Sequence, residues 1–211
     1  MKVYFSPLAC SLGTRIALYE AGAQAEYVQV DGKTKLTADG ADFRQVHPLG
    51  LVPALVLEDG RLIAENAAVL QYVAERFPDA GLAPRDFLGR ARLQQLLCFI
   101  GTELHKALYV PLLDRNAPEA VKAYALTKQE LRLSWLSEQL RGRQFLLDQF
   151  SIADGYLFAV LNWSQVAPVK FSEFEPIVGF MDRMRARPAV ARALAEETQL
   201  YREELARNAA A

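Results

Sequence analysis

The stretch Ser6-Pro7-Leu8-Ala9-Cys10-Ser11-Leu12-Gly13 lies between a short apolar and aromatic run at residues 3–5 and a segment with helical periodicity at residues 15–21. That order predicts a strand, a turn and a helix, with a cysteine and a serine where the helix starts. A thiol at this place faces the unpaired N–H groups and the positive dipole end of the helix, and both favour the nucleophilic thiolate. The position also suits a small buried cysteine followed by a serine cap, so two interpretations of Cys10 remain.

The composition excludes several classes of function. Lysine plus arginine (24) nearly balances aspartate plus glutamate (25), so we expect neither a nucleic-acid surface nor a polybasic membrane patch. The start of the chain lacks a signal-peptide pattern, and we expect no apolar run as long as a membrane span. Cys10 and Cys98 form no CxxC pair, which favours free thiols in a reducing cytoplasm. His47 and His105 lack acidic partners at ligand spacing, so we expect no metal.

The first 78 residues alternate strand and helix patterns. Residues 26–30 alternate polar and apolar side chains, as a half-buried strand does. Asp59-Gly60 predicts a two-residue hairpin turn between strands at 56–58 and 61–63. Residues 67–77 form an amphipathic pattern with Asn66 at the helix start, and the N-terminus of that helix favours a bound carboxylate. We therefore predict an α/β domain with the order β-α-β, hairpin, α.

The loop His47-Pro48-Leu49-Gly50-Leu51-Val52-Pro53 precedes the third strand. Pro53 stands at the first residue of that strand, where a missing N–H costs least. A cis bond before Pro53 would turn the backbone N–H and C=O of Val52 outward, where they could pair with an extended peptide. The alternative is a trans proline that only starts the strand.

The rest of the chain has helical periodicity. Residues 79–85 have the composition of a linker. Ser151, followed three residues later by Asp154, predicts a capping box at the start of a central helix. The expected helical segments are 86–114, 118–141, 151–167, 175–187 and a last one from Pro188. Residues 86–211 are therefore expected to form a separate helical domain.

A cysteine at the first helix start, a Val-Pro before the third strand, an acid before the next helix and an all-helical partner together resemble the glutathione S-transferases. The residue strings that resemble the bacterial beta class are 9–12, 40–43, 50–55, 103–106 and 151–158. The resemblance implies an α/β thioredoxin-like N-terminal domain (1–78), followed by an all-α helical-bundle C-terminal domain (86–211). It also implies a cytoplasmic homodimer that acts in detoxification, with glutathione as co-substrate and no metal.

The resemblance also implies site residues in the first domain. Cys10 would lie beside the sulfur of glutathione, with Ser11 next to it. Lys35 would meet a glutathione carboxylate, and the Val52 backbone would pair with the cysteinyl part ahead of a cis Pro53. The remaining contacts come from Leu51, which stands where the family commonly has glutamine, and from Glu65 and the N–H of Asn66 at the γ-glutamyl end.

Four residues of the second domain would border the site, partly from the neighbouring subunit: Thr102, Glu103, His105 and Lys106. Cys10, Ser11 and His105 are the catalytic candidates. Tyr156 and Trp163 are candidate apolar walls, although an inward-facing aromatic on that helix suits the core equally well.

Three functions follow. The favoured one is transfer of glutathione to an apolar electrophile. Lowering the thiol pKa from about 8.5 by two units needs about 2.7 kcal/mol, which a helix terminus and one hydrogen bond from Ser11 or a backbone N–H can supply. The second is thiol transfer or reduction through a mixed disulfide at Cys10, which glutathione must resolve because no CxxC partner exists. The third is a non-catalytic dimeric carrier with weakened glutathione binding, suggested by Leu51 and by Cys98, which stands where the family tends to have asparagine.

Overall fold

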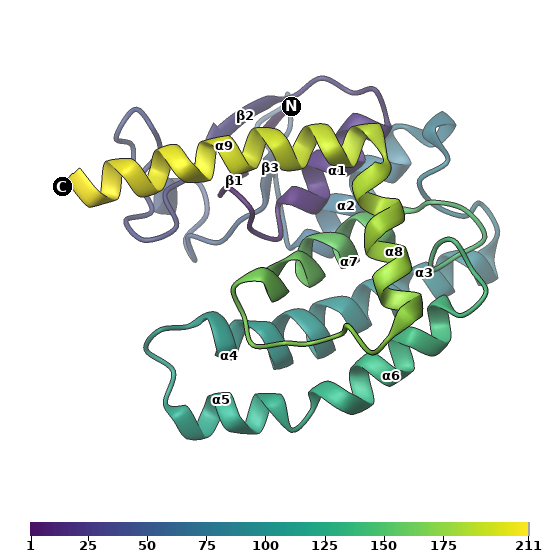
Figure 1. The fold of residues 1–211 in the computed structure, drawn as a ribbon. Helices are drawn as coiled ribbons and strands as arrows, with labels where there is room; N and C mark the ends of the chain where they lie inside the picture. Colours follow the sequence, from purple (N-terminus) through teal and green to yellow (C-terminus); the bar gives the residue numbers. More distant parts are fainter. Residues whose placement is uncertain (211) are drawn as a thin grey trace. The chain divides into compact units, whose positions relative to one another are not determined.

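The computed structural model describes residues 1–210, and the chain divides into two compact units. The first unit holds Met1–Leu82 together with the C-terminal helix α9 (Pro188–Ala210), and the second unit is Ala83–Arg187. We had expected the last helix to belong to the helical domain. It joins the first unit because it packs along α1 (Leu12–Glu20), as Figure 1 shows.

The first unit is built on a mixed four-stranded sheet with the order β2-β1-β3-β4. Strand β1 pairs parallel with β2 and antiparallel with β3, and β3 pairs antiparallel with β4. This is the predicted thioredoxin-like arrangement. The strands are β1 (Lys2–Phe5), β2 (Glu26–Gln29), β3 (Ala54–Val56) and β4 (Leu62–Ala64).

The two faces of β1 are covered differently. Val3 and Phe5 are buried in the main core, in a unit whose helices α1 and α2 (Asn66–Arg76) pack against each other. Tyr4 points to the opposite face, since successive strand side chains alternate. There its ring stacks on Phe43 with the ring centroids 5.0 Å apart. Phe43 belongs to the short 3₁₀ helix η1 (Phe43–Gln45), and a second one, η2 (Pro78–Ala80), follows α2.

The hairpin between β3 and β4 has a longer loop than predicted. The Leu57 N–H donates to the carbonyl of Arg61 at 2.9 Å, so three residues form the turn instead of two. Gly60 takes a left-handed backbone with φ of 83°. A three-residue loop whose last position is left-handed is a common alternative to the two-residue turn, and Asp-Gly suits both.

The second unit is entirely helical in its regular structure, as predicted. The first expected segment is one continuous helix, Phe87–Leu113, whose middle portion has π-helical hydrogen bonding. The segment expected at 118–141 is two helices, because the Thr127 hydroxyl donates to the carbonyl of Tyr124 at 2.7 Å and competes with the helical ladder. The helices are α3 (Phe87–Phe99), η3 (Ile100–Tyr109), α4 (Val110–Leu113), α5 (Glu119–Leu126), α6 (Gln129–Leu140), α7 (Ile152–Asn162), η4 (Trp163–Gln165) and α8 (Glu175–Ala186).

Helix α7 is the centre of the second unit, and every residue in it is buried. Its capping box is confirmed: the Ser151 N–H donates to Asp154 Oδ2 at 2.9 Å. Asp154 Oδ1 also accepts the Leu146 N–H at 2.9 Å, so the same carboxylate fixes the preceding loop. Burial raises the pKa of Asp154 to about 6, against the lowering effect of these hydrogen bonds.

The helix Phe87–Leu113 has 27 residues and is long and apolar enough to cross a membrane by length and composition. The expectation that no run approaches a membrane span was therefore wrong. Core helices of soluble proteins pass the same test, so this property alone assigns no membrane location.

Candidate functional site

The chain brings the Cys10 thiol to the loop before β3. Cys10 Sγ donates to the carbonyl of Val52 at 3.3 Å, and the Val52–Pro53 peptide bond is cis, as one of the two interpretations predicted. The thiol is only 7% exposed. This hydrogen bond uses the thiol proton, so it exists for the neutral thiol and is lost in the thiolate.

Ser11 is placed differently from the prediction. Helix α1 begins at Leu12, and Ser11 is the N-cap by position, but its side chain makes no capping hydrogen bond. Its hydroxyl donates instead to the carbonyl of Ser6 at 3.2 Å. The hydroxyl has a single proton, so the hydrogen bond that we expected at the Cys10 sulfur is directed to the turn.

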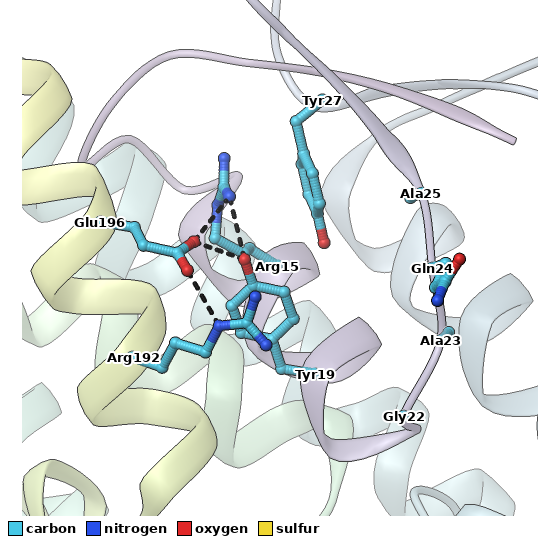
Figure 2. A pocket seen from close by; sticks show the side chains of 9 residues that line it. All are labelled: Arg15, Tyr19, Gly22, Ala23, Gln24, Ala25, Tyr27, Arg192 and Glu196. Atoms are coloured by element: carbon cyan, nitrogen blue, oxygen red, sulfur yellow. Dashed lines mark hydrogen bonds and ion pairs between the residues drawn. The ribbon is translucent and has the colours of Figure 1, made fainter.

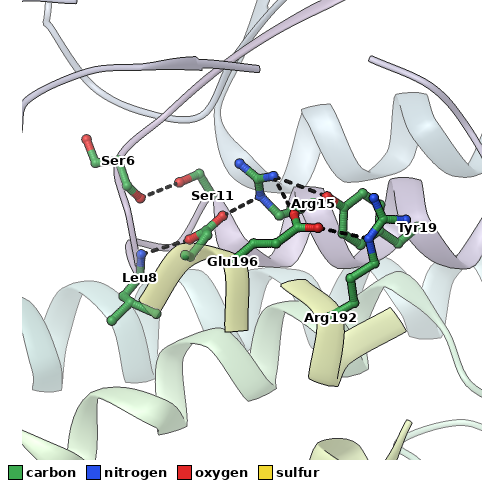
Figure 3. A network of polar contacts seen from close by, with 8 residues as sticks. Ser6, Leu8, Ser11, Arg15, Tyr19, Arg192 and Glu196 are labelled. Atoms are coloured by element: carbon green, nitrogen blue, oxygen red, sulfur yellow. Dashed lines mark hydrogen bonds and ion pairs between the residues drawn. The ribbon is translucent and has the colours of Figure 1, made fainter. Parts of the chain in front are cut away.

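A buried carboxylate from the other end of the chain supports this turn. Figure 3 shows Leu8 and Ser11 of the turn together with Arg15. The Leu8 N–H donates to Glu197 Oε2 at 2.8 Å, and Arg15 Nε donates to Glu197 Oε1 at 2.8 Å. Glu197 is completely buried, and burial raises its pKa to about 7 against the opposing charge of Arg15. Sequence reasoning missed all three residues, since no local pattern links positions more than 180 apart.

Lys35 lies against the same loop as Val52. A Cβ added at Gly50 would come within 3.4 Å of side-chain carbons of Lys35 and Arg44, so both stems cover this glycine. Gly50 itself has φ of 59°, which favours glycine. Leu51 follows with 45% of its surface exposed. The structure therefore places Lys35, Leu51 and Val52 together.

Glu65 and Asn66 form the start of α2. Glu65 is the N-cap with φ of 68°, and Asn66 is the first helical residue, so its predicted place at the helix start is confirmed. Asn66 Oδ1 accepts the Thr14 hydroxyl at 3.2 Å, while its Nδ2 is buried without a hydrogen-bond partner in the described part of the chain.

Among residues 1–210, three residues other than glycine have a positive φ: Leu8, Lys35 and Glu65. Each such conformation costs on the order of 1–3 kcal/mol, and such residues gather at functional sites. Lys35 and Glu65 were predicted site residues, and Leu8 stands in the turn before Cys10. Backbone conformation therefore marks the same region that the sequence indicated.

His105 is a buried, neutral imidazole within the second unit. Its Nδ1 lies 2.8 Å from the Tyr156 hydroxyl, and its ring meets the Trp163 ring with centroids 4.9 Å apart. Burial, and then the charge of Lys106, lower the pKa of His105 to about 4. Tyr156 is 3% exposed, so it belongs to the core, which was one of the two interpretations.

The other candidates of the second unit lie on the same helical stretch. Glu103 pairs with Arg132, which also donates through Nε to the Glu103 carbonyl at 3.1 Å. The Thr102 hydroxyl donates to the carbonyl of Cys98 at 2.9 Å, and Lys106 is exposed. Cys98 is exposed as well, whereas its place in a helix between Leu97 and Phe99 predicts a small buried residue, so that prediction is wrong. Its neighbours Leu97 and Ile100 face the core, and the helical period turns Cys98 outward.

The chain matches the glutathione S-transferase N-terminal domain over residues 9–76 and the glutathione S-transferase C-terminal domain over residues 97–188. The chain belongs to the glutathione S-transferase family. It is a glutathione transferase, and glutathione is the co-substrate that this family binds.

Individual members of the family are similar to this chain over almost the whole length of both proteins. Glutathione S-transferase GstA of Escherichia coli O157:H7 is 39% identical over 199 residues, which cover 93% of this chain and 98% of that relative. A sphingomonad glutathione S-transferase solved in complex with glutathione is 40% identical, with a TM-score of 0.88 over 94% of this chain and 99% of that one. The bacterial beta-class transferase of Sphingomonas chungbukensis is 41% identical, with a TM-score of 0.88 over 93% and 98%.

The candidate site residues carry thiol, ammonium, imidazole and carboxylate groups. Within residues 1–210, no group of three or more His, Cys, Asp or Glu could hold a metal ion. In the first unit the structure brings together Cys10, Val52, Lys35 and Leu51, and it places Glu65 and Asn66 at a helix N-terminus. That arrangement places a thiol beside the backbone of the loop before β3, and it places the start of α2 in the same unit.

Proposed function

We propose that this transferase is a cytoplasmic beta-class homodimer that conjugates glutathione to apolar electrophiles in detoxification, with Cys10 beside the glutathione sulfur. The observation that carries the proposal is the 3.3 Å contact between Cys10 Sγ and the Val52 carbonyl. The backbone N–H and C=O of Val52, called the Val52 edge below, could pair with an extended peptide. Such a peptide would bring its own side chain next to Cys10. The similarity to the Sphingomonas chungbukensis enzyme supports the class.

The charges around this edge suit the ends of glutathione. Glutathione carries two carboxylates and one ammonium group. The Lys35 ammonium would pair with one carboxylate, and the N-terminus of α2 at Asn66 would receive the other. The exposed carboxylate of Glu65 would pair with the ammonium. Roles in glutathione binding for Thr102, Glu103, His105 and Lys106 stay predictions.

The hydrogen bond at Cys10 suggests how it acts. When the cysteinyl N–H of glutathione takes the Val52 carbonyl, the Cys10 S–H becomes free to donate to the glutathione thiolate. A hydrogen bond to the charged form favours that form. The thiolate then forms a bond from sulfur to the electrophilic carbon, the leaving group departs with its electron pair, and the thiol proton passes to water.

Thiol transfer is the second candidate, favoured by the same proximity of the two sulfur positions. The Cys10 thiolate would attack the glutathione sulfur of a mixed disulfide, forming Cys10–S–SG and releasing the other thiolate. A second glutathione thiolate would then attack this bond, giving glutathione disulfide and the free Cys10 thiolate.

The variants Cys10→Ala and Cys98→Ala separate these functions, because Cys98 is an exposed cysteine outside the Val52 edge. Loss of a charge-assisted hydrogen bond should slow conjugation of chlorodinitrobenzene about tenfold in Cys10→Ala. Cys98→Ala should conjugate as the wild type does. Unchanged conjugation in Cys10→Ala would contradict the proposed role of Cys10. Unchanged disulfide exchange in Cys10→Ala would exclude thiol transfer through Cys10.

A further inference from the structure

A loop of the first unit, residues 30–42, leads from β2 to η1 and carries Lys35, which the proposed function pairs with a carboxylate of glutathione. Lys35 has φ of 64°, a backbone conformation that residues other than glycine rarely adopt. Such a conformation persists only where the surrounding structure fixes it. The place of Lys35 therefore depends on the residues that hold this loop.

The start of the loop is fixed by packing and hydrogen bonding at the end of β2. Figure 2 shows Tyr27 of β2 next to Arg15 of α1, whose guanidinium lies 3.9 Å from the centre of the Tyr27 ring. Two residues further along β2, Gln29 Nε2 donates to Glu204 Oε2 of α9 at 2.8 Å. Asp31, which follows shortly after, therefore leaves the sheet from a fixed point.

Asp31 makes the hydrogen bonds that close the turn around Lys35. Its carboxylate oxygen Oδ1 accepts the Lys33 N–H at 2.9 Å, the Thr34 N–H at 2.6 Å and the Thr34 hydroxyl at 2.9 Å. Its carbonyl accepts the Lys35 N–H at 3.0 Å, and its own N–H donates to the Leu36 carbonyl at 2.9 Å. One residue thus holds the backbone on both sides of the left-handed position.

The rest of Lys35 is held from the opposite direction. Its carbonyl accepts the Phe43 N–H at 2.9 Å, and Phe43 is buried in a small cluster with Val30 and Ala54. The carbons of the Lys35 stem lie against Gly50, within 3.4 Å of where a Cβ would be. With its backbone and its stem fixed, the Lys35 ammonium group can reach only a small region.

We propose that Asp31 is a positioning residue for glutathione: by closing the turn, it holds the Lys35 ammonium group where that group pairs with the glycine carboxylate. The pairing rests on the proposed function, in which the other carboxylate, at the γ-glutamyl end, lies at the N-terminus of α2. Asp31 acts through Lys35 and makes no contact with glutathione itself. Loss of its carboxylate should therefore weaken one contact of the ligand and leave the others unchanged.

The test compares Asp31→Ala, Asp31→Asn, Lys35→Gln and the double variant Asp31→Ala/Lys35→Gln. Asp31→Asn should keep the turn, because all three side-chain contacts are made by Oδ1, which the amide oxygen of asparagine can replace. Asp39→Ala is the matched control, since Asp39 is an acid of the same loop that accepts the Ala41 N–H at 3.3 Å and the Thr37 hydroxyl. Neither of these contacts belongs to the turn that Asp31 closes.

Calorimetric titration with glutathione, and with the ethyl ester of its glycine carboxylate, measures two dissociation constants for each variant. The stoichiometry of each titration reports the folded fraction, so partial unfolding does not imitate weaker binding. The wild type should bind the ester about tenfold more weakly than glutathione, because the ester removes the charge-assisted contact with Lys35. Asp31→Ala should weaken the binding of glutathione about fivefold and that of the ester less than about twofold.

The remaining variants show whether Asp31 acts through Lys35. Asp31→Asn and Asp39→Ala should bind both ligands as the wild type does. Once Lys35 is glutamine, Asp31→Ala should have no further effect, because the two substitutions remove the same contact. In conjugation assays Asp31→Ala should raise the KM for glutathione and leave kcat within about twofold, since this contact is equally strong in the ground state and the transition state.

Three results would overturn the proposal: equal weakening of glutathione and ester by Asp31→Ala, an undiminished effect of Asp31→Ala in the Lys35→Gln background, or weakening by Asp39→Ala as large as by Asp31→Ala. Two other results would lie with the wild type. No binding of glutathione at millimolar concentration would overturn the proposed function together with this proposal. Equal binding of glutathione and the ester would overturn the pairing of Lys35 with the glycine carboxylate, and the role of Asp31 with it.

Discussion

Asp154 in the second unit and Glu197 in the first are two completely buried carboxylates, and they differ in how far along the chain their hydrogen-bond partners lie. Each accepts a backbone N–H from a loop that must be held in place, Asp154 from Leu146 and Glu197 from Leu8. The partners of Asp154 lie within eight residues of it, whereas Leu8 lies 189 residues from Glu197. One carboxylate fixes its own helix start, and the other joins the two ends of the chain.

The difference shows which contacts can be predicted from a sequence. A capping box has fixed spacing, so Ser151 and Asp154 predict their own contact. The contact of Glu197 with Leu8 depends on where α9 lies on α1, and no spacing rule gives that. The turn before Cys10 therefore depends on a residue that sequence patterns could not identify.

The largest expected effect comes from removing the distant carboxylate. Glu197→Leu removes the acceptor of Arg15 Nε and of the Leu8 N–H, and it leaves the buried Arg15 guanidinium with only its longer contact to Glu196. Breaking this buried ion pair should lower the free energy of unfolding by about 3–5 kcal/mol at a pH above the Glu197 pKa. Urea denaturation measures this loss. Glu196→Gln is the matched control, and it should cost no more than about 1 kcal/mol because that side chain is partly exposed. An equal loss of unfolding free energy in both variants would mean that the complete burial of Glu197 does not increase its contribution to stability.

The local carboxylate should matter slightly less. Asp154→Ala leaves the Leu146 and Ser151 N–H groups buried without acceptors, which should cost about 2–4 kcal/mol in the same measurement. Asp148→Ala removes an exposed acid of the same loop and should change stability by no more than about 0.5 kcal/mol. A loss larger than that of Glu197→Leu would reverse the comparison.

Titration should distinguish the two acids by their pH windows. Each folded-state pKa is raised, so each acid contributes stability at low pH that is lost as the pH rises through the folded value. For Asp154 the loss falls between pH 3.8 and about 6 and is on the order of 3 kcal/mol. For Glu197 it falls between pH 4.5 and about 7.

The measurement compares the stability of the wild type with that of Asp154→Asn and of Glu197→Gln across this range. Taking differences removes the contribution of His105, whose lowered pKa makes the protein lose stability as the pH falls. Between pH 6 and 7 only the difference for Glu197→Gln should still change. A change there for Asp154→Asn alone would contradict the assignment.

The smallest effect tests whether the two regions are independent. Ser151→Ala should cost about 1 kcal/mol, because it removes the serine of the capping box. Combined with Asp154→Ala it should deviate from additivity by about 0.5 kcal/mol or more, since the residues touch. Combined with Glu197→Leu it should be additive within about 0.5 kcal/mol. Coupling between Ser151 and Glu197 would show that the two carboxylates do not act separately.

Much of the fold could be predicted because its signals are local. The strand-turn-helix around Cys10 followed from the order of residue types, whereas that order left both the cis and the trans form of the Val52–Pro53 bond open. Where tertiary packing decides, the predictions were wrong or incomplete. The outward face of Cys98 follows from helix rotation, and the break at Thr127 follows from one hydroxyl. The supports of the Cys10 turn could not be predicted at all, because they come from α9.

The central claim is that glutathione pairs with the Val52 edge beside Cys10, and amide resonances of the ¹⁵N-labelled protein test it most directly. On addition of glutathione, the amides of Cys10, Val52 and Asn66 should shift together and saturate along one binding curve. Binding that leaves Cys10 and Val52 unshifted, or no shift at millimolar glutathione, would contradict the account.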